Sequence, residues 1–446
     1  MPSDDAALCH EAITRWHHLL REGALPDDDR GLAQLRRLTV YGDRKVMQVV
    51  RPHFLTPARY ESESLACALV ARALAKACAA VREDHDVLDE LDVRGHERDL
   101  ILIDPGFENP DVFDRFDAFA SKRLGLVEVQ GAAPGGVGYV DAAARAFQAM
   151  AIHDRFSEEF DIEPLLVADP LRESMLQAWR DFGGSGDPAI AIVDWDDAPL
   201  MMEFELIRDD LVAAGLDVTI CDPRQLRFEG GRLQGPNGPI DLVYRRLVIM
   251  DCLSRPDDVK ALVDAARAGA ACLVNPFASD LMGHKSIFDL LTDEDRDFGL
   301  TSTERNAVRN HVPWTRVLVA EADPHDHRTV GRDEVVEHRT SLVLKPVHDY
   351  GGHGVTLGWE TDPREWEELV GRAVADGHLV QRRIQAHREP WPWDAPEFPL
   401  RELYVDNDPY MFRGRMGGIL ARLSGSGITN VTAGGSLAPT FLVRPR

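Results

Sequence analysis

Two stretches of the chain combine charged side chains with a backbone that can approach a ligand. In the first, SLVLKPVHDYGGHGVTLG (residues 341–358), Lys345 ends an apolar run and Gly351, Gly352 and Gly354 follow. Glycines let backbone N–H groups wrap an anion, and the lysine adds positive charge, so the pattern predicts a phosphate clamp. The alternative is a core ion pair beside an ordinary glycine hairpin, because a buried ammonium needs an anionic partner.

The second stretch, DRFDAFASKRLGLVEVQG (residues 114–131), predicts a β-hairpin with charged groups on one face. Arg115 and Asp117 are two residues apart, as are Glu128 and Gln130, so each pair shares a face of its strand. One register sets Asp117 opposite Glu128 and Arg115 opposite Gln130. Facing carboxylates repel unless a cation lies between them, and carboxylate and amide oxygens suit Mg²⁺. An exposed hairpin, with Arg115 neutralising the acids, is the alternative.

The elements that must position these groups belong to an α/β chain. Residues 4–23 and 61–82 have helical periodicity, and residues 189–222 read strand, helix, strand, which is one βα unit of a parallel sheet. That unit lacks GxGxxG, so it gives little support to dinucleotide binding. After about residue 335 strands dominate the sequence.

Composition limits the classes of function. The 446 residues are 44% hydrophobic and 28% charged, enough for more than one hydrophobic centre. A net charge of −25 argues against nucleic acid and anionic membranes as partners. No apolar run approaches the roughly 18 residues of a membrane span. The N-terminus lacks the pattern of a signal peptide, and the six cysteines are scattered without CxxC, so we expect a cytoplasmic protein with reduced thiols.

In this order, the pieces resemble the circularly permuted ATP-grasp ligases, of which glutathionylspermidine synthetase is the familiar type. That family's Arg-x-Asp and Glu-x-Asn motifs are matched by Arg115-Phe-Asp117 and Glu128-Val-Gln130, with glutamine in place of asparagine. The Asp of the family's "ADTP" run is missing here, which leaves a substrate contact there in doubt. The resemblance implies that Asp117, Glu128 and Gln130 hold Mg²⁺ and that Arg115 is catalytic.

The resemblance extends to the nucleotide half. The run VNPFASDLMGHKSIFDLLTDE contains Lys285, which with Lys345 and its glycines is implied to bind the phosphates of ATP. The run HLVQRRI resembles the strand past the adenine and contains Gln381. Asp406 and Asn430 are rival metal ligands, because unpermuted ATP-grasp enzymes take theirs from after the lysines.

The resemblance implies an α/β fold with α+β character, of the circularly permuted ATP-grasp type. We expect a helical N-terminal region over 1–98 and the metal-binding hairpin segment over 99–186. A Rossmann-like βα subdomain over 187–275 follows, and the nucleotide-binding lid and closing strands occupy 276–446.

The function implied is an ATP-dependent carboxylate–amine ligase that forms an amide or peptide bond through an acyl phosphate and releases ADP and phosphate. Its partners would be a small-molecule carboxylate and an amine, and a homodimer is left open. Arg415 and Arg422 are candidates to face phosphate or a substrate carboxylate, or to lie at the surface. Two alternatives remain: an ATP-binding protein of this fold without ligase activity, and a structural or partner-binding α/β protein.

Overall fold

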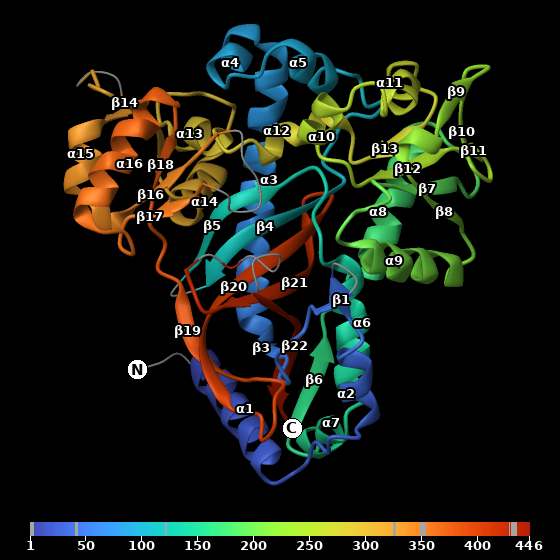
Figure 1. Cartoon of the computed structure of the whole chain (residues 1–446), viewed down its shortest axis with the longest axis vertical. Coiled ribbons are helices and arrows are strands. Elements are labelled where there is room, and N and C mark those ends of the chain that lie inside the picture. Colours follow the sequence, from blue (N-terminus) through green and yellow to red (C-terminus); the bar gives the residue numbers. More distant parts are fainter. Residues whose placement is uncertain are drawn as a thin grey trace.

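The computed structural model of the chain describes residues 4–40, 43–120, 123–323, 327–347, 354–427, 429 and 435–446. Within these residues the strands form five sheets, and three of the sheets surround the candidate site. Figure 1 shows a central sheet with a smaller sheet on either side of its upper part.

The central sheet joins strands that are far apart in the sequence. Its order is β3–β22–β21–β20–β4–β5, with β19 paired to β20 and β6 paired to β22. The strand bounds are β3 (His53–Leu55), β4 (Phe113–Ala120), β5 (Leu124–Gln130), β6 (Phe160–Pro164), β19 (His387–Pro392), β20 (Leu400–Phe412), β21 (Arg415–Ser424) and β22 (Ser436–Pro445). The predicted hairpin, β4 and β5, therefore lies directly beside the closing strands of the chain.

Helices of the N-terminal half surround this sheet: some contact its strands, and others pack on those helices or lie beyond its upper end (Figure 1). They are α1 (Asp4–Arg21), α2 (Arg30–Leu35), α3 (Pro57–Glu83), α4 (His85–Glu90), α5 (Gly95–Ile101), α6 (Val137–Gln148) and α7 (Ala151–Phe156). A two-stranded sheet of β1 (Thr39–Val40) and β2 (Arg44–Lys45) lies between α2 and β3 in the sequence. The helical N-terminal region that the sequence predicts thus contains short strands as well.

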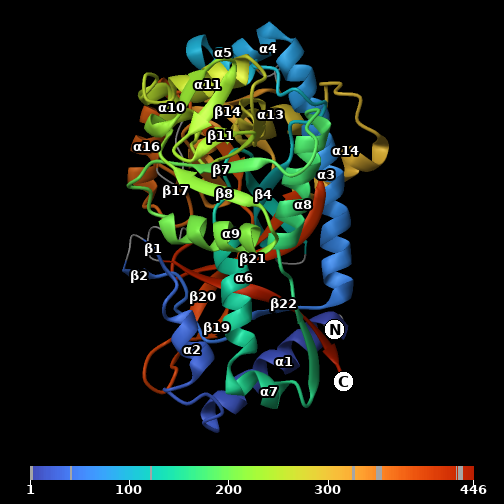
Figure 2. The ribbon, with the colours of Figure 1, turned by 90° about the vertical axis from the view of Figure 1, so that its right-hand side faces the viewer.

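The longest helix, α3, runs along one side of the molecule (Figure 2). Thr56 caps its start by accepting a hydrogen bond from the backbone N–H of Arg59 at 3.2 Å, and Pro57 occupies the first turn. By length and composition α3 could cross a membrane. Its buried face packs against α14 (Ser302–His311) and β21, as that of a core helix does.

A four-stranded parallel sheet of order β13–β12–β7–β8 forms the second unit. It confirms the predicted βα unit and the Rossmann-like arrangement. The elements are β7 (Ala189–Val193), β8 (Asp217–Cys221), β12 (Leu242–Arg245) and β13 (Cys272–Val274), with α8 (Ala168–Asp181), α9 (Met201–Ala213), α10 (Ile249–Ser254), α11 (Lys260–Arg267) and the 3-10 helix η1 (Pro223–Gln225). A small antiparallel sheet is attached to it: β9 (Arg227–Glu229), β10 (Arg232–Gly235) and β11 (Gly238–Ile240).

A five-stranded sheet of order β15–β14–β18–β16–β17, which we call the lid sheet, lies on the other side. Its strands are β14 (Thr315–Val319), β15 (Thr329–Gly331), β16 (Leu342–Lys345), β17 (Thr356–Leu357) and β18 (Leu379–Arg382). Its own core contains Trp366 on α16. The helices α13 (Ile287–Thr292), α15 (Arg332–Glu337) and α16 (Pro363–Ala375) contact this sheet, and η3 (Arg339–Ser341) leads into β16. The helices η2 (Phe277–Ser279) and α12 (Asp280–Gly283) precede α13 and contact α5 and β5, respectively.

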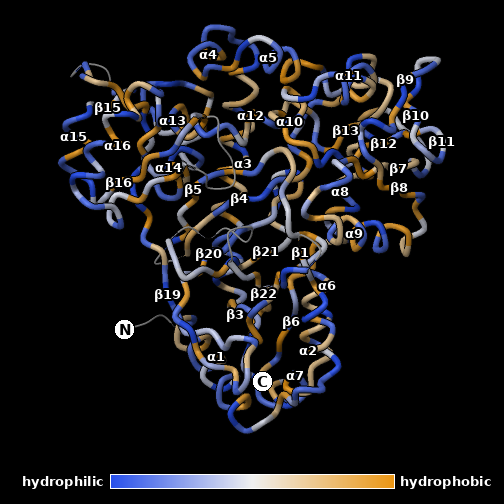
Figure 3. The backbone as a smooth tube through the Cα atoms, viewed as in Figure 1, coloured by the Kyte–Doolittle hydropathy of each residue, from blue (hydrophilic) through white to orange (hydrophobic). Residues whose placement is uncertain are grey.

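Hydrophobic residues of the sheets and their covering helices form several buried clusters, whereas peripheral helices such as α4 and α15 are mostly hydrophilic (Figure 3). The lid sheet has a separate hydrophobic core from the central sheet. Two units with separate cores can move relative to each other more easily than parts of one core. The candidate site lies where they meet.

Candidate active site

The hairpin of β4 and β5 has the register that the sequence predicts. Asp117 lies opposite Glu128, and Arg115 lies opposite Gln130. The register shifts directly after Asp117, where a β-bulge interrupts the ladder. There the Ala118 N–H donates 3.1 Å to a carboxylate oxygen of Asp408 on β20, so a side chain takes the place of a strand carbonyl. The β-bulge thus sets the register in which Asp117 faces Glu128.

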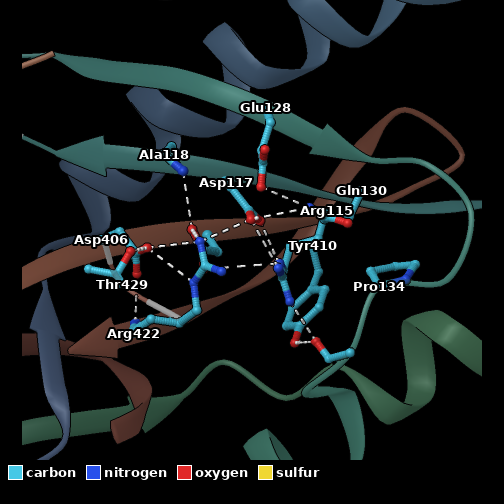
Figure 4. Close-up of polar contacts among 12 residues, drawn as sticks. Arg115, Asp117, Ala118, Glu128, Gln130, Pro134, Asp406, Tyr410, Arg422 and Thr429 are labelled. Carbon is cyan, nitrogen blue, oxygen red and sulfur yellow. Dashed lines mark hydrogen bonds and ion pairs between the residues drawn. The ribbon is translucent and has the colours of Figure 1, made fainter. Parts of the chain in front are cut away.

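Asp117 is held by two arginines (Figure 4). Arg115 donates to both of its carboxylate oxygens, at 2.7 Å from Nε and 3.1 Å from Nη2, which is the bidentate geometry that favours strong ion pairs. Arg422 Nη2, from β21, lies 3.0 Å from Asp117 Oδ2. Arg115 also donates 2.9 Å to the carbonyl of Gly135. Arg115 is therefore fixed in place by contacts at both ends of its guanidinium group.

Arg422 is half-buried and links three strands. Its Nε lies 2.5 Å from Asp408 Oδ2, and its Nη2 lies 2.9 Å from Asp406 Oδ2, both on β20. Thr429 donates a short hydrogen bond to the same oxygen of Asp406. Asp406, a rival metal ligand in the sequence, is thus engaged by Arg422 and Thr429. The second rival, Asn430, lies outside the described residues.

Burial and the two arginines set the charge of the acids. Burial raises the pKa of Asp406 to about 6, although Arg422 opposes the shift. Burial also raises the pKa of Asp408 well above its usual value. Burial alone would raise the pKa of Asp117 too, but Arg115 and Arg422 outweigh it and hold that pKa at about 2. Asp117 is therefore the carboxylate that stays ionised across the physiological range.

The predicted phosphate lysine is buried between the lid sheet and the hairpin. Lys345 on β16 is 7% exposed, and its Nζ donates 2.7 Å to the carbonyl of Val127 on β5. Gln381 on β18 donates to the same carbonyl at 3.3 Å and to Thr315 Oγ1 at 3.2 Å. Burial lowers the pKa of Lys345 to about 8; Lys285 lowers it further, whereas Glu128 and Asp117 raise it. The charges of Glu128 and Asp117 therefore act on the pKa of Lys345, while its ammonium group donates its hydrogen bond to the Val127 carbonyl.

Two adjoining pockets open beside these groups. The first spans about 260 Å³, open solvent included, and its lining comes from the hairpin (Glu128), the α12–α13 segment (Lys285, Phe288) and the lid sheet (Lys345, Gln381). The second, of about 810 Å³, shares Glu128 and Lys285 with the first and adds Gln130 and Glu97. Lys285 follows α12 and so reaches the site from a different element than Lys345. The structure brings both predicted lysines, Gln381, Glu128 and Gln130 to one place.

The predicted glycine loop is described only in part. Gly351 and Gly352 lie outside the described residues, so their contact with phosphate stays a prediction. Gly354 is exposed and has a φ of +69°, a left-handed conformation that glycine adopts without steric cost.

The predicted metal ligands suit a hard cation in type. Glu128 accepts a 3.0 Å bond from the Gln130 amide at one oxygen, and both side chains line the larger pocket. Asp117 already accepts from guanidinium groups at both carboxylate oxygens, so a metal would have to share or displace one of these contacts. In the part of the chain that the structure describes, no group of three or more His, Cys, Asp or Glu side chains could hold a metal. Asp117, Glu128 and Gln130 provide only two carboxylates and one amide, which is fewer acidic ligands than such a group would contain. Their role as metal ligands stays a prediction.

The sequence did not indicate a role for Asp408. For Arg422 it left open whether the side chain faces a phosphate or substrate carboxylate or lies at the surface. Asp408 precedes Pro409 and is fully buried, and Arg422 is half-buried beside it, whereas Arg415 is exposed. The available signal was the spacing of Asp406 and Asp408, which places both on one face of a strand. Their pairing with Arg422 depends on the register of β20 against β21, which the sequence alone does not give.

No family model matches the chain. It is 22% identical over 339 residues to an uncharacterized protein of Mycobacterium tuberculosis and over 340 residues to one of Mycobacterium leprae. Each match covers 70% of this chain but only 56% and 55% of the relatives, so it spans little more than half of their length.

A solved glutathione synthetase-like effector from Globodera pallida, in its apo form, superposes with a TM-score of 0.57. The superposition covers 99% of this chain and 98% of that chain at 14% identity. The chain has a glutathione synthetase-like fold of the ATP-grasp type. At this identity the likeness shows the fold, and it confirms the predicted fold class. A shared fold does not fix the ligand, which depends on this chain's own residues.

Proposed function

We propose that this chain is an ATP-dependent carboxylate–amine ligase. One observation carries the proposal: Lys285 and Lys345, from separate elements, meet Glu128 of the central hairpin around adjoining pockets. Two ammonium groups near an acidic edge suit a polyphosphate accompanied by a divalent cation. The ATP-grasp-type fold agrees with that ligand but does not by itself establish it.

Each residue would have a distinct task. Lys345 and Lys285 would bind the phosphates, and Gln381, beside Thr315, would border the base. Asp117, Glu128 and Gln130 would hold Mg²⁺, which when bound neutralises charge on the β- and γ-phosphates. Arg115, fixed by Asp117 and the Gly135 carbonyl, would stabilise the transferring phosphoryl group. These tasks are positioning and electrostatics, which supply most of the catalysis in phosphoryl transfer.

The reaction would proceed in two steps. A carboxylate oxygen of the first substrate forms a bond to the γ-phosphorus of ATP as the bond to ADP breaks, which gives an acyl phosphate. An amine nitrogen then attacks the acyl carbon, phosphate leaves, and the nitrogen loses a proton to form the amide. Closure of the lid sheet over the pockets would keep water from hydrolysing the acyl phosphate.

A second candidate, an ATP-binding protein without ligase activity, is favoured by one observation. Both oxygens of Asp117 are already paired with guanidinium groups, so this carboxylate has little freedom to bind a metal. A chain whose metal site forms poorly would bind ATP and turn it over slowly. The structural alternative rests on the hydrogen bond of Lys345 to Val127.

Thermal unfolding with ATP, with and without Mg²⁺, tests the proposal. We expect ATP to stabilise the wild type only with Mg²⁺, and Glu128→Ala and Lys345→Ala to lose that gain. Lys260→Ala is the matched control, because Lys260 lies on α11 and pairs with Asp264 away from both pockets. No shift with ATP under any condition would refute nucleotide binding. ATP binding without ADP release, over a panel of carboxylates and amines, would leave the second candidate.

Three finer points belong to the same proposal. We propose a circularly permuted ATP-grasp order, because the hairpin with the metal ligands precedes both lysines in the chain. We propose a cytoplasmic location, where ATP and reduced thiols are available. A homodimer is the proposed assembly, which size-exclusion chromatography with light scattering would test.

A further inference from the structure

A third cavity lies beside the two arginines, and the nucleotide proposal does not use it. It opens to solvent, spans about 530 Å³ with that open part included, and is bordered by Arg115, Arg422 and the backbone of Gly135 and Gly136. Its remaining lining residues are apolar or aromatic: Val40, Val46, Tyr139, Leu200, Leu420 and Leu437. Among the described residues that line it, the arginines are the charged ones, and neither an Asp nor a Glu is present.

The charged end of the cavity has a donor to spare. Within the described part of the chain, Arg422 Nε and Nη2 contact Asp117, Asp406 and Asp408, whereas Nη1 has no acceptor. A guanidinium group presents five N–H donors, so Arg422 can bind a further anion without losing its present partners.

The helix end at this cavity is not the anion site. Gly136 precedes α6, and its N–H donates 2.8 Å to Glu203 Oε1. A buried carboxylate of the chain therefore already occupies the N-terminus of α6. A ligand anion would have to bind the guanidinium groups instead.

The other end of the cavity excludes charge. The hydroxyl of Tyr139 donates 2.6 Å to the carbonyl of Thr39, so it is already paired. Leu420 and Leu437 are 1% and 3% exposed, and they come from β21 and β22 of the central sheet. A second charged group on a ligand would lose its hydration against these side chains without gaining a partner.

We propose that this cavity binds the carboxylate substrate, and that the substrate is a monocarboxylic acid with an uncharged hydrocarbon chain, its carboxylate against Arg422 and its chain against the apolar wall. This inference rests on the proposed ligase function. It follows from the position of the arginines, which contact Asp117 on the hairpin that also carries Glu128 toward the nucleotide pockets. A carboxylate at this place lies beside the group proposed to stabilise the phosphoryl transfer.

Binding of 4-methylpentanoate, compared with glutarate, tests the inference. The two acids have similar lengths, but glutarate ends in a second carboxylate. Calorimetry or saturation-transfer NMR is run on the full chain, with and without a non-hydrolysable ATP analogue and Mg²⁺. We expect 4-methylpentanoate to bind at least about tenfold more tightly, which corresponds to 1.4 kcal/mol.

Leu200→Asp places a charge in the apolar wall with little risk to folding. Leu200 is half-buried and occupies the N-cap position of α9, where aspartate is favoured. We expect it to weaken 4-methylpentanoate about tenfold or more. Val212→Asp, at an exposed position on the same helix, is the control and should change nothing.

Equal affinity for the two acids, an unaffected Leu200→Asp variant, or no binding of 4-methylpentanoate under either condition would overturn the inference. The ligase proposal has a separate outcome. If 4-methylpentanoate binds as expected but ADP is released with none of the amines tried, the cavity assignment stands and the ligase is refuted. If ATP is turned over with a dicarboxylate or an amino acid instead, the ligase stands and this substrate class is refuted.

Discussion

Replacing Lys345 by methionine separates its proposed role in phosphate binding from a structural role. Methionine has a similar length but no charge. Burial lowers the pKa of Lys345 from 10.5 to about 8. Since one pKa unit corresponds to about 1.4 kcal/mol, keeping this side chain charged at pH 7 costs about 3 kcal/mol of folding free energy.

The substitution should leave no buried group without a partner. The carbonyl of Val127 that Lys345 contacts also accepts a hydrogen bond from Gln381, at 3.3 Å. Lys345→Met should therefore be as stable as the wild type or more stable at pH 7, by up to about 3 kcal/mol. ATP affinity should fall about tenfold to a hundredfold, because a hydrogen bond to a charged group contributes about 1.5–3 kcal/mol.

The stability effect also has a pH signature. Between pH 8 and 10.5 the unfolded chain holds a proton on Lys345 that the folded chain has released, so the wild type gains stability as the pH rises through this window. The variant lacks that gain. The advantage of Lys345→Met should therefore be largest below pH 8 and should vanish near pH 10.5.

Urea unfolding at pH 7, 9 and 10.5, and ATP titration by calorimetry, measure the two effects on the same proteins. Lys260→Met, with an exposed lysine on α11, is the control for both. A loss of several kcal/mol of stability in Lys345→Met, with unchanged ATP affinity, would refute the reasoning. It would make Lys345 a structural ion-pair partner of the hairpin acids.

Three further predictions concern the framework. Gly136→Ala should cost about 1–3 kcal/mol in urea unfolding, because φ is +100° and the new Cβ would lie 2.6 Å from the Tyr410 hydroxyl; Gly23→Ala, with φ +75° and open space, should cost less. Burial lowers the pKa of His53 to about 4, so stability should fall as the pH drops from 6.5 to 4, and His53→Phe should flatten that slope in acid titration. Arg422→Met should destabilise the fold by about 3–5 kcal/mol, because it leaves buried carboxylates uncompensated; an unfolding curve like that of the wild type would contradict this.

The faces of the hairpin strands were predictable from local information, because alternation along each strand decides which side chains share a face. The predicted pair of Asp117 and Glu128 is confirmed. The pairs nearest the turn, such as Ala120 with Leu124, are one residue out of that register, and the β-bulge after Asp117 produces it. The parallel βα unit was predictable for the same reason, because β7, α9 and β8 are consecutive.

The arginine network was not predictable, because it depends on contacts between distant segments. The sequence around Pro409 reads as two strands, yet β20 is continuous through it. The paired positions on β4 begin only after Pro409, at Tyr410, and the bulge at Ala118 turns that N–H toward the Asp408 carboxylate. Pro409 on β20, which has no N–H to donate, therefore lies beside the β-bulge at Ala118 on β4. The proline does not predict the bulge, and the sequence around Ala118 does not predict the proline.

The network around Arg422 has a consequence for how the chain is made. Asp117 is synthesised before the parallel sheet and the lid sheet, whereas Arg422 follows both. Until β21 emerges from the ribosome, Asp117 has Arg115 as its cation, and Asp406 and Asp408 lack their shared partner. The parallel sheet can fold earlier from consecutive segments, but the central sheet must wait for its last strands. Nascent chains halted before β21 should therefore protect the parallel sheet from protease while the hairpin is still open to cleavage.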